Sequence, residues 1–313
     1  MSAFDFDAAV TTPFRMQPGL RRLAAGTRTL HRLDPASAAF AEKLTVLQQH
    51  ADAALLSVDG FDARPAWQAL AREAEAQAPG LFAADDAGLV ANRLGCRVAW
   101  DGLQLTHQPG AHAAALACLR ALPVPQRVAG LLSLALHEDF AVVDAASTTL
   151  QALAVCLPSH WAPTDKIGRP FAAVHAPVAD NATLLAAAQH LMQLVCRPPR
   201  WERFVWNVTA HPHHDQHPQR HARRDWPRDA AAQVDAAHWR TEHQSFIPLP
   251  GRQQAVFTIH VEVQPLAAAI DTPARAAALH AALASMSEAV LTYRHLAAAR
   301  PALLAWLAAR AAG

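Results

Sequence analysis

Residues able to carry out chemistry are concentrated between positions 137 and 178 of this 313-residue chain. They include His137-Glu138-Asp139, the segment from Asp165 to Arg169, and His175 followed by Ala-Pro-Val. A neutral imidazole nitrogen is a good ligand for a transition metal or a haem iron. Because proline restricts its own φ and the residue before it, His175 is predicted in a stiffened turn ahead of a helix that begins near 182. A histidine there can equally be a hydrogen-bonded structural residue, and both interpretations stay open at this point.

A second polar group lies in two segments with the pattern of β-strands. Trp206 and Asn207 belong to the first, and Arg240, Glu242 and Gln244 alternate along the second. Since successive side chains of a strand point to opposite faces, the last three share one face. Such a face is either a solvent-facing surface or the polar wall of a pocket. The apolar alternation of the following segment favours the pocket.

Histidines are also dense between positions 211 and 224. This composition can indicate metal binding, but prolines interrupt the backbone and the spacing gives neither HExxH nor a pair on one helical turn. The segment is therefore predicted to be a solvated loop that joins two strands.

Cysteine and glycine usage excludes several classes of site. Without a CxxC pair, the four cysteines form no local zinc ribbon or iron–sulfur motif, and reduced, buried thiols are expected. The 12 glycines form neither GxGxxG nor GxxxxGK[ST], so the chain lacks the standard loops that hold nucleotide phosphates. Electrons for any redox reaction are therefore expected from another protein. The cysteines are Cys96, Cys118, Cys156 and Cys196.

The charge balance indicates a soluble globular protein. Lys and Arg number 27 against 26 Asp and Glu, which leaves a net charge of +1. This balance gives no general electrostatic attraction to nucleic acid or anionic lipid. No apolar run approaches the roughly 20 residues that span a bilayer, and the first ten residues lack a signal-peptide pattern. We therefore expect a cytoplasmic protein.

Periodicity predicts the elements that must position these residues. Helices are predicted at 37–52, 65–78, 110–122, 182–195, 273–286 and 301–311. Strands are predicted at 140–143, 150–157, 203–209, 239–247 and 255–263, with a weaker pair within 97–107. Hairpin-type links indicate a mostly antiparallel sheet. The predicted fold is α+β, with an N-terminal helical region, 1–125, that packs on an α+β core, 126–313, as one compact unit.

Taken in order, these motifs resemble the haem-dependent oxidative N-demethylase family, specifically its haem-carrying alpha subunit. The family implies a PAS-like haem-binding domain, in which helices flank an antiparallel sheet. Two departures are His243, where arginine is common and could bridge a haem propionate, and Ala179, where a further proline is common. The resemblance covers most of the chain and rests on Pro13–Met16, Glu138-Asp139, Pro158-Ser159 with Trp161, Lys166–Arg169, His175–Val178, Trp206-Asn207, Arg240-x-Glu242-x-Gln244, Val256–Ile259 and Pro265-Leu266.

Carried over to this chain, the resemblance implies roles for particular residues. His175 is the expected proximal ligand of a haem b iron, with His137 and His160 ranked lower. The expected partners of the haem propionates are Lys166, Arg169 and Arg240. The polar distal side, where O2 and an amine are held, is expected to consist of Trp206, Asn207 and Glu242.

The activity implied by the resemblance is oxidative N-demethylation of a small secondary or tertiary methylamine, similar to dimethylamine. The reaction uses O2 and releases formaldehyde. Its electrons come from a partner reductase subunit that carries FMN and a 2Fe-2S cluster. Two alternatives stay open: a non-catalytic haem-based gas or redox sensor on the same scaffold, and a cofactor-free interaction subunit whose apolar groove binds a small ligand.

Overall fold

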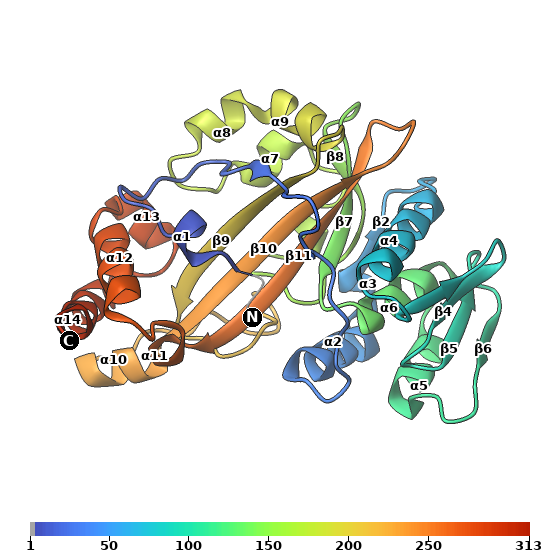
Figure 1. Ribbon diagram of the computed structural model, residues 1–313, viewed down its shortest axis with the longest axis horizontal. Helices are drawn as coiled ribbons and strands as arrows, with labels where there is room; N and C mark the ends of the chain where they lie inside the picture. The colour runs from blue at the N-terminus through green and yellow to red at the C-terminus, as the bar shows by residue number, and fades with distance from the viewer. Residues whose placement is uncertain (1–3) are drawn as a thin grey trace.

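Seven strands form one antiparallel sheet through the centre of the molecule (Figure 1). The computed structural model describes residues 4–313. The strands lie in the order β1-β9-β10-β11-β7-β8-β2, and every neighbouring pair is antiparallel. All five strands predicted between 140 and 263 are confirmed, with ends shifted by up to three residues. The seven strands are β1 (Arg21–Arg22), β2 (Leu55–Ser57), β7 (Asp139–Asp144), β8 (Thr149–Ala154), β9 (Trp201–Thr209), β10 (His238–Pro248) and β11 (Gln254–Pro265).

The N-terminal region covers one part of the back face of this sheet. Its apolar side chains continue into a single cluster with Phe140 and Val142 of β7. Trp67 meets Phe140 edge-to-face at 5.1 Å between ring centroids, and burial of each such side chain contributes about 1.5–3 kcal/mol. The helices of this region are α2 (Ala38–Gln49), α3 (Ala51–Ala54), α4 (Arg64–Gln77), α5 (Ala113–Ala121) and α6 (Arg127–Ala135), with a 3-10 turn at Val124–Gln126.

The N-terminal region, predicted to be helical apart from one weak strand pair, contains more β-structure than expected. It holds a second, four-stranded antiparallel sheet in the order β3-β4-β5-β6. The weak strand pair predicted within 97–107 is confirmed as its last two strands, whereas its first two strands were not predicted. Those two are short and contain alanine and glycine, which have weak strand propensity. The strands are β3 (Phe82–Ala84), β4 (Gly88–Ala91), β5 (Cys96–Ala99) and β6 (Leu105–His107).

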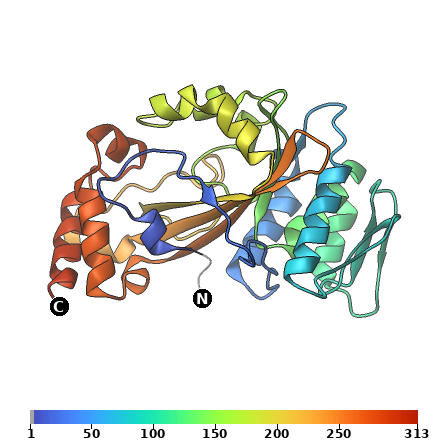
Figure 2. The ribbon, with the colours of Figure 1, turned by 45° about the horizontal axis from the view of Figure 1, so that its top comes forward.

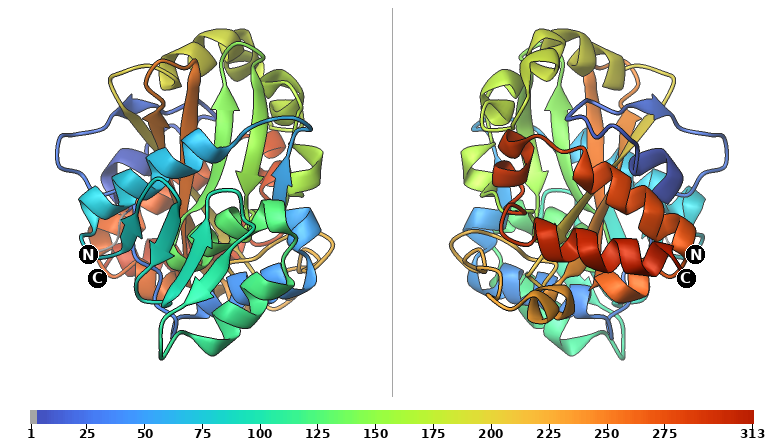
Figure 3. Two further views of the ribbon diagram at one scale, coloured as in Figure 1. Left: turned by 90° about the vertical axis from the view of Figure 1, so that its right-hand side faces the viewer. Right: turned by 90° about the vertical axis from the view of Figure 1, so that its left-hand side faces the viewer.

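The C-terminal helices lie at the opposite end of the molecule (Figure 3). They form a separate apolar cluster with Trp206 of β9 and Trp239 of β10, whose rings stack at 5.1 Å. The short helix α1 also joins this cluster through Phe6. The helices are α1 (Phe6–Ala9), α10 (Ala230–Ala236), α11 (Leu266–Ala269), α12 (Pro273–Ala284), α13 (Glu288–Tyr293) and α14 (Arg300–Ala311).

The front face of the sheet is covered by the long connection between β8 and β9 (Figure 2). Met192 and Val195 of this connection pack on Val143, Phe246 and Phe257 of the sheet. The helix predicted at 182–195 is interrupted at position 187, so it forms two helices. The connection contains a 3-10 turn at Pro163–Asp165 and helices α7 (Phe171–His175), α8 (Ala182–Ala186) and α9 (Ala188–Val195).

The largest apolar cluster spans the predicted domain boundary at 125/126, since it contains residues from Leu30 to Val261. The boundary itself stays a prediction. No helix among residues 4–313 has the length and apolar character needed to cross a membrane.

Candidate functional site

A cavity of about 570 Å³ lies between the front face of the sheet and the β8–β9 connection. This volume is within the range of small-molecule and cofactor sites. Arg240, Glu242 and Gln244 all line it, so the alternation predicted for their strand, and the pocket it favoured, are confirmed. The cavity is lined by all seven residues to which the resemblance gave a first-choice role: Lys166, Arg169, His175, Trp206, Asn207, Arg240 and Glu242.

His175 is not in the turn that was predicted, since it is the last residue of the short helix α7 and the turn follows at 176–177. Its ring is held by that helix. Its Nδ1 lies 2.8 Å from the carbonyl oxygen of Phe171, and the two rings stack at 3.9 Å. Burial lowers the pKa of His175 to about 4, so the ring is neutral near pH 7. In a neutral imidazole that carries its proton on Nδ1, Nε2 has no proton and keeps a free lone pair. Nε2 makes no hydrogen bond to residues 4–313 and is therefore free to bind a metal.

Lys166 supports the same helix. Its Nζ donates to the carbonyl oxygen of Val174, next to His175, at 2.7 Å. Burial lowers the pKa of Lys166, although Asp165 opposes the shift. Arg169 is exposed at the cavity wall. Lys166 therefore fixes the end of α7, whereas the guanidinium of Arg169 is accessible to a ligand.

Arg240 is buried, and three of its N–H groups are already used. They donate to the hydroxyl of Ser159 at 2.6 Å, to the carbonyl of Leu157 at 2.8 Å and to the carbonyl of His214 at 2.7 Å. The Ser159 hydroxyl in turn donates to Glu242. Arg240 thus fastens two loops to the sheet and has little capacity left for a ligand.

Glu242 lies on the cavity wall with both carboxylate oxygens engaged. Oε1 accepts from Ser159, and Oε2 accepts from Gln244 at 2.6 Å. Arg240 is 4.0 Å from Oε1. Because a carboxylate has about four acceptor positions, Glu242 retains capacity for a cationic ligand.

Two other residues on this wall have unused polar atoms. Oδ1 of Asn207 and Nε of Arg203 are buried and have no hydrogen-bond partner among residues 4–313. Burial also lowers the pKa of Arg203. A buried polar group without a partner costs about 1–3 kcal/mol. A ligand with both a donor and an anionic group would relieve both costs.

The sequence analysis missed Arg203 and Arg294, and both line the cavity. Burial lowers the pKa of Arg294 to about 10, and its Nε also has no partner among the described residues. The alternation of Arg203 with Asn207 along one strand could have revealed the first. Arg294 lies at the end of a distant helix, and no local pattern indicates it.

The indole of Trp206 points away from the polar wall. It stacks on Trp239 in the cluster behind the sheet, and its Nε1 donates to the carbonyl oxygen of Ala9 at 3.0 Å. Trp206 thus has no free donor for a ligand. His243 is also on the back face, where its Nε2 lies 2.7 Å from Glu202. The missing arginine at position 243 therefore removes no cavity contact.

The two lower-ranked histidines lie in different places. His160 lines the cavity in a backbone conformation with φ of +57°, and burial lowers the pKa of its ring to about 3. Unlike His175, its ring has no hydrogen-bond partner among residues 4–313 that would orient it. His137 lies outside the cavity, and its Nε2 is 3.0 Å from the carbonyl oxygen of Val261.

The histidine-rich segment is a loop, as predicted, but it is only partly solvated. His211, Asp215, Gln216 and His217 are buried, because Glu42 of α2 accepts hydrogen bonds from the loop and the Gln216 backbone pairs with residues 158–160. It does join two strands, as predicted. The amino-acid composition of the segment does not reveal hydrogen bonds of this kind.

A segment near the N-terminus closes one side of the cavity. Met16, Gln17 and Pro18 line it. The backbone N–H of Phe14 donates to the hydroxyl of Ser285 at 2.8 Å, and Arg294 lies over the Phe14 ring at 4.6 Å. Residues 13–18, here called the crossing segment, are therefore anchored to the C-terminal helices.

The comparison with protein families gives one match. A family model described as haem-dependent oxidative N-demethylase, alpha subunit-like, matches residues 41–304. The matched stretch includes the cavity residues from Val143 to Arg294 but not the crossing segment. No curated protein matches the chain.

Proposed function

Because the chain belongs to the haem-dependent oxidative N-demethylase alpha subunit-like family, we propose that it binds haem b in the cavity and demethylates a small methylamine. The substrate is a secondary or tertiary amine similar to dimethylamine. When bound, haem supplies the oxygen chemistry, and formaldehyde is the product. The protein supplies the iron ligand, the anionic contacts and the amine contacts.

The observation that carries this proposal is the hydrogen bond from His175 to Phe171. Iron-ligating histidines commonly donate their second ring N–H to an acceptor, which fixes the tautomer and the ring orientation. Nδ1 of His175 has this acceptor at 2.8 Å, and Nε2 is the free nitrogen. The lowered pKa keeps the ring neutral, as ligation requires.

The propionates are assigned to the arginines on the wall. Arg203 has an unpartnered buried Nε, and Arg169 is exposed beside the cavity. A buried guanidinium is stabilised by a carboxylate partner. Since the donors of Arg240 are largely used, Arg203 takes the role that the sequence suggested for Arg240. Lys166 is proposed to position α7 rather than to bind a propionate.

The amine is assigned to Asn207 and Glu242. An ammonium N–H can donate to the unpartnered Oδ1 of Asn207, and Glu242 supplies the negative charge. These contacts orient a cationic amine and discriminate against a neutral molecule of the same size. Trp206 contributes to the wall without donating to the ligand.

The remaining parts of the proposal concern the scaffold and the electron donor. The five strands β9-β10-β11-β7-β8, with the β8–β9 helices over one face, support a PAS-like haem domain.

The four cysteines are free and buried, and the sequence has no phosphate-binding glycine loop. We therefore propose a separate reductase subunit that carries FMN and a 2Fe-2S cluster.

The test is the absorption spectrum of the haem-loaded protein. We expect a Soret band in the wild type and its loss in His175→Ala, with recovery when imidazole is added to fill the vacated position. His160→Ala is the matched control, since it removes another half-buried, neutral histidine from the same cavity. An unchanged spectrum in His175→Ala, or loss of the band in His160→Ala alone, would contradict the assignment.

Turnover is measured with dimethylamine, O2 and an artificial reductant. Formaldehyde release is expected, and Asn207→Leu and Glu242→Gln should lower it while the Soret band persists. Reversible O2 binding without formaldehyde release would contradict the proposed enzyme activity and favour a haem-based sensor.

A further inference from the structure

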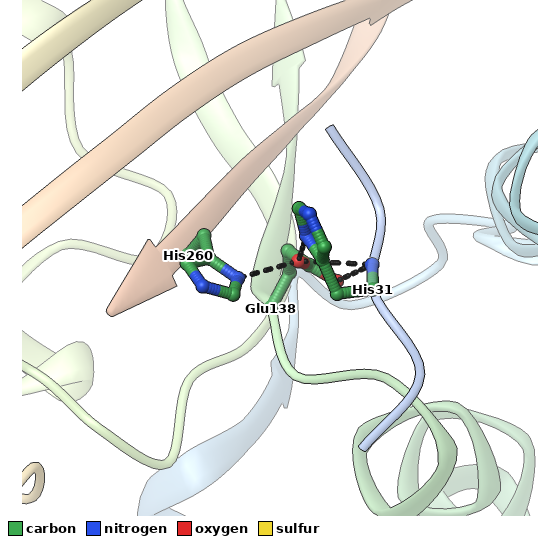
Figure 4. Close-up of side chains that lie close together, drawn as sticks. All are labelled: His31, Glu138 and His260. Carbon is green, nitrogen blue, oxygen red and sulfur yellow. Dashed lines mark hydrogen bonds and ion pairs between the residues drawn. The ribbon is translucent and has the colours of Figure 1, made fainter. Parts of the chain in front are cut away.

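Three ligand-type side chains meet on the sheet face opposite the cavity (Figure 4). Nδ1 of His31 and Nδ1 of His260 each lie 2.8 Å from the same oxygen, Oε1 of Glu138. One ligand atom from each of the three residues lies within 4.8 Å of the other two. His260 is on the back face because its neighbour in β11, Val261, pairs with the cavity residue Glu242.

The three residues come from separate parts of the chain. His31 precedes α2, Glu138 precedes β7, and His260 lies in the middle of β11. Glu138 is only 1% exposed and His260 only 5%, whereas the side chain of His31 is 27% exposed. The cluster is therefore enclosed on the sheet side and open to solvent at His31.

We propose that His31, Glu138 and His260 bind a divalent cation of the Zn²⁺ type, at a site separate from the cavity. Two imidazole nitrogens and one carboxylate oxygen are a ligand set that Zn²⁺ accepts, with water in the remaining position. The open side at His31 provides both the entry path and the place for that water.

The surroundings of the cluster match those of a metal site. The backbone N–H of His31 donates to Oε2 of Glu138 at 3.0 Å, which orients the carboxylate. Nε2 of His260 lies 3.7 Å from Oε1 of Glu262. A carboxylate behind a ligating histidine is a common outer contact that fixes the ring. When the cation binds, it replaces the protons that lie between Oε1 of Glu138 and the Nδ1 atoms of His31 and His260. Protons that the two rings do not retain are released to solvent.

The neighbouring histidine His137 does not belong to the ligand set. Its ring is 4.2 Å from the ring of His260, but its Nε2 is engaged by the carbonyl of Val261. It therefore provides a control that is close in space and identical in chemistry.

The test is Zn²⁺ titration of the full-length protein without a polyhistidine tag, followed by calorimetry. We expect one tightly bound equivalent in the wild type and in His137→Gln. In His31→Gln the affinity should fall by more than about 100-fold, since loss of a ligand exceeds the effect of losing an outer contact. His31 is the preferred position because its partial exposure leaves the core intact. Zn²⁺ should also raise the melting temperature of the wild type and not that of His31→Gln.

The histidine-rich segment requires its own control. His213→Gln/His221→Gln removes two of its accessible imidazoles and should leave the tight equivalent in place. The proposal is overturned if the wild type binds no stoichiometric Zn²⁺, if His31→Gln binds as tightly, or if only the loop variant loses binding. Because the site is on the opposite face from the cavity, the Soret band should be retained in His31→Gln. Absence of the Soret band from the wild type would contradict the haem proposal but not the Zn²⁺ proposal.

Discussion

Replacement of Lys43 by methionine should be among the most destabilising single changes in this protein. Lys43 lies in α2 with its side chain fully buried. Its Nζ is 3.1 Å from Oδ1 of Asp139 and donates to the carbonyl oxygens of Leu136 and Glu138 at 3.2 and 2.8 Å. The ammonium therefore connects the N-terminal region to the start of β7.

The size of the effect follows from what is left behind. In Lys43→Met, the Asp139 carboxylate keeps only one hydrogen bond to residues 4–313, from the N–H of Leu157 at 2.6 Å. It loses its cation while Asp139 is only 1% exposed. Removal of one partner from a buried ion pair costs about 3–5 kcal/mol. Typical domains have only about 5–15 kcal/mol of stability. We expect the loss to be a large fraction of the total free energy of unfolding.

The assay is urea unfolding followed by tryptophan fluorescence. The control is Arg93→Met, which breaks the Arg93–Asp34 pair at 2.8 Å, whose side chains are 49% and 56% exposed; this should cost under about 1 kcal/mol. Lys43→Met/Asp139→Asn should recover part of the loss, because the second change removes the unpaired charge. If Lys43→Met costs no more than Arg93→Met, the reasoning about burial is refuted.

Three further outcomes are expected. Burial lowers the pKa of His160 to about 3 and of His175 to about 4. Since the unfolded chain takes up these protons near pH 6.5, the haem-free protein should lose stability as pH falls from about 6.5 to about 4, on the order of 3 kcal/mol per histidine. Urea unfolding over a pH series checks this, and His160→Gln should flatten the slope. Gly102→Ala should cost more than about 2 kcal/mol in urea unfolding, because φ is +76° and its Cβ would lie 2.1 Å from the Val124 carbonyl oxygen; Gly110→Ala, with φ of +79° and open space, should cost about 1 kcal/mol, and equal costs would refute the clash. Burial raises the pKa of all four cysteines, so a thiol reagent at pH 8 should label them only after unfolding; rapid labelling of the native protein would contradict this.

The sequence analysis predicted five of the seven strands of the central sheet, including β10, whose burial alternates along most of its length, and missed the two- and three-residue strands β1 and β2. It missed α6, in which every residue from Val128 to Ala135 is buried. A helix without a polar face lacks the 3.6-residue periodicity on which such predictions depend. It also missed β3 and β4, whose alanine and glycine weaken the strand pattern, whereas β5 and β6 are equally short and were predicted.

The cavity was predicted in part. Several motifs that are contiguous in sequence, such as the turn after His175, carried the resemblance and proved to line the cavity, whereas Glu138-Asp139 and Pro265-Leu266 do not line it. Which donors are free was not predictable, because the partners of Arg240 come from loops far away in the chain. The His31–Glu138–His260 cluster was missed for the same reason: Glu138 is 107 residues from His31 and 122 from His260.

The crossing segment has a practical consequence for expression. The matched family region begins at residue 41, and a truncated version designed from it would discard Met16 and Pro18 together with the anchor at Phe14. Such a version would leave the cavity without one side, so solvent would reach the haem that we propose binds there and would weaken its retention. Recombinant versions should therefore retain the first twenty residues, with any purification handle placed after α14, whose end lies away from helices α7, α8 and α9 (Figure 1).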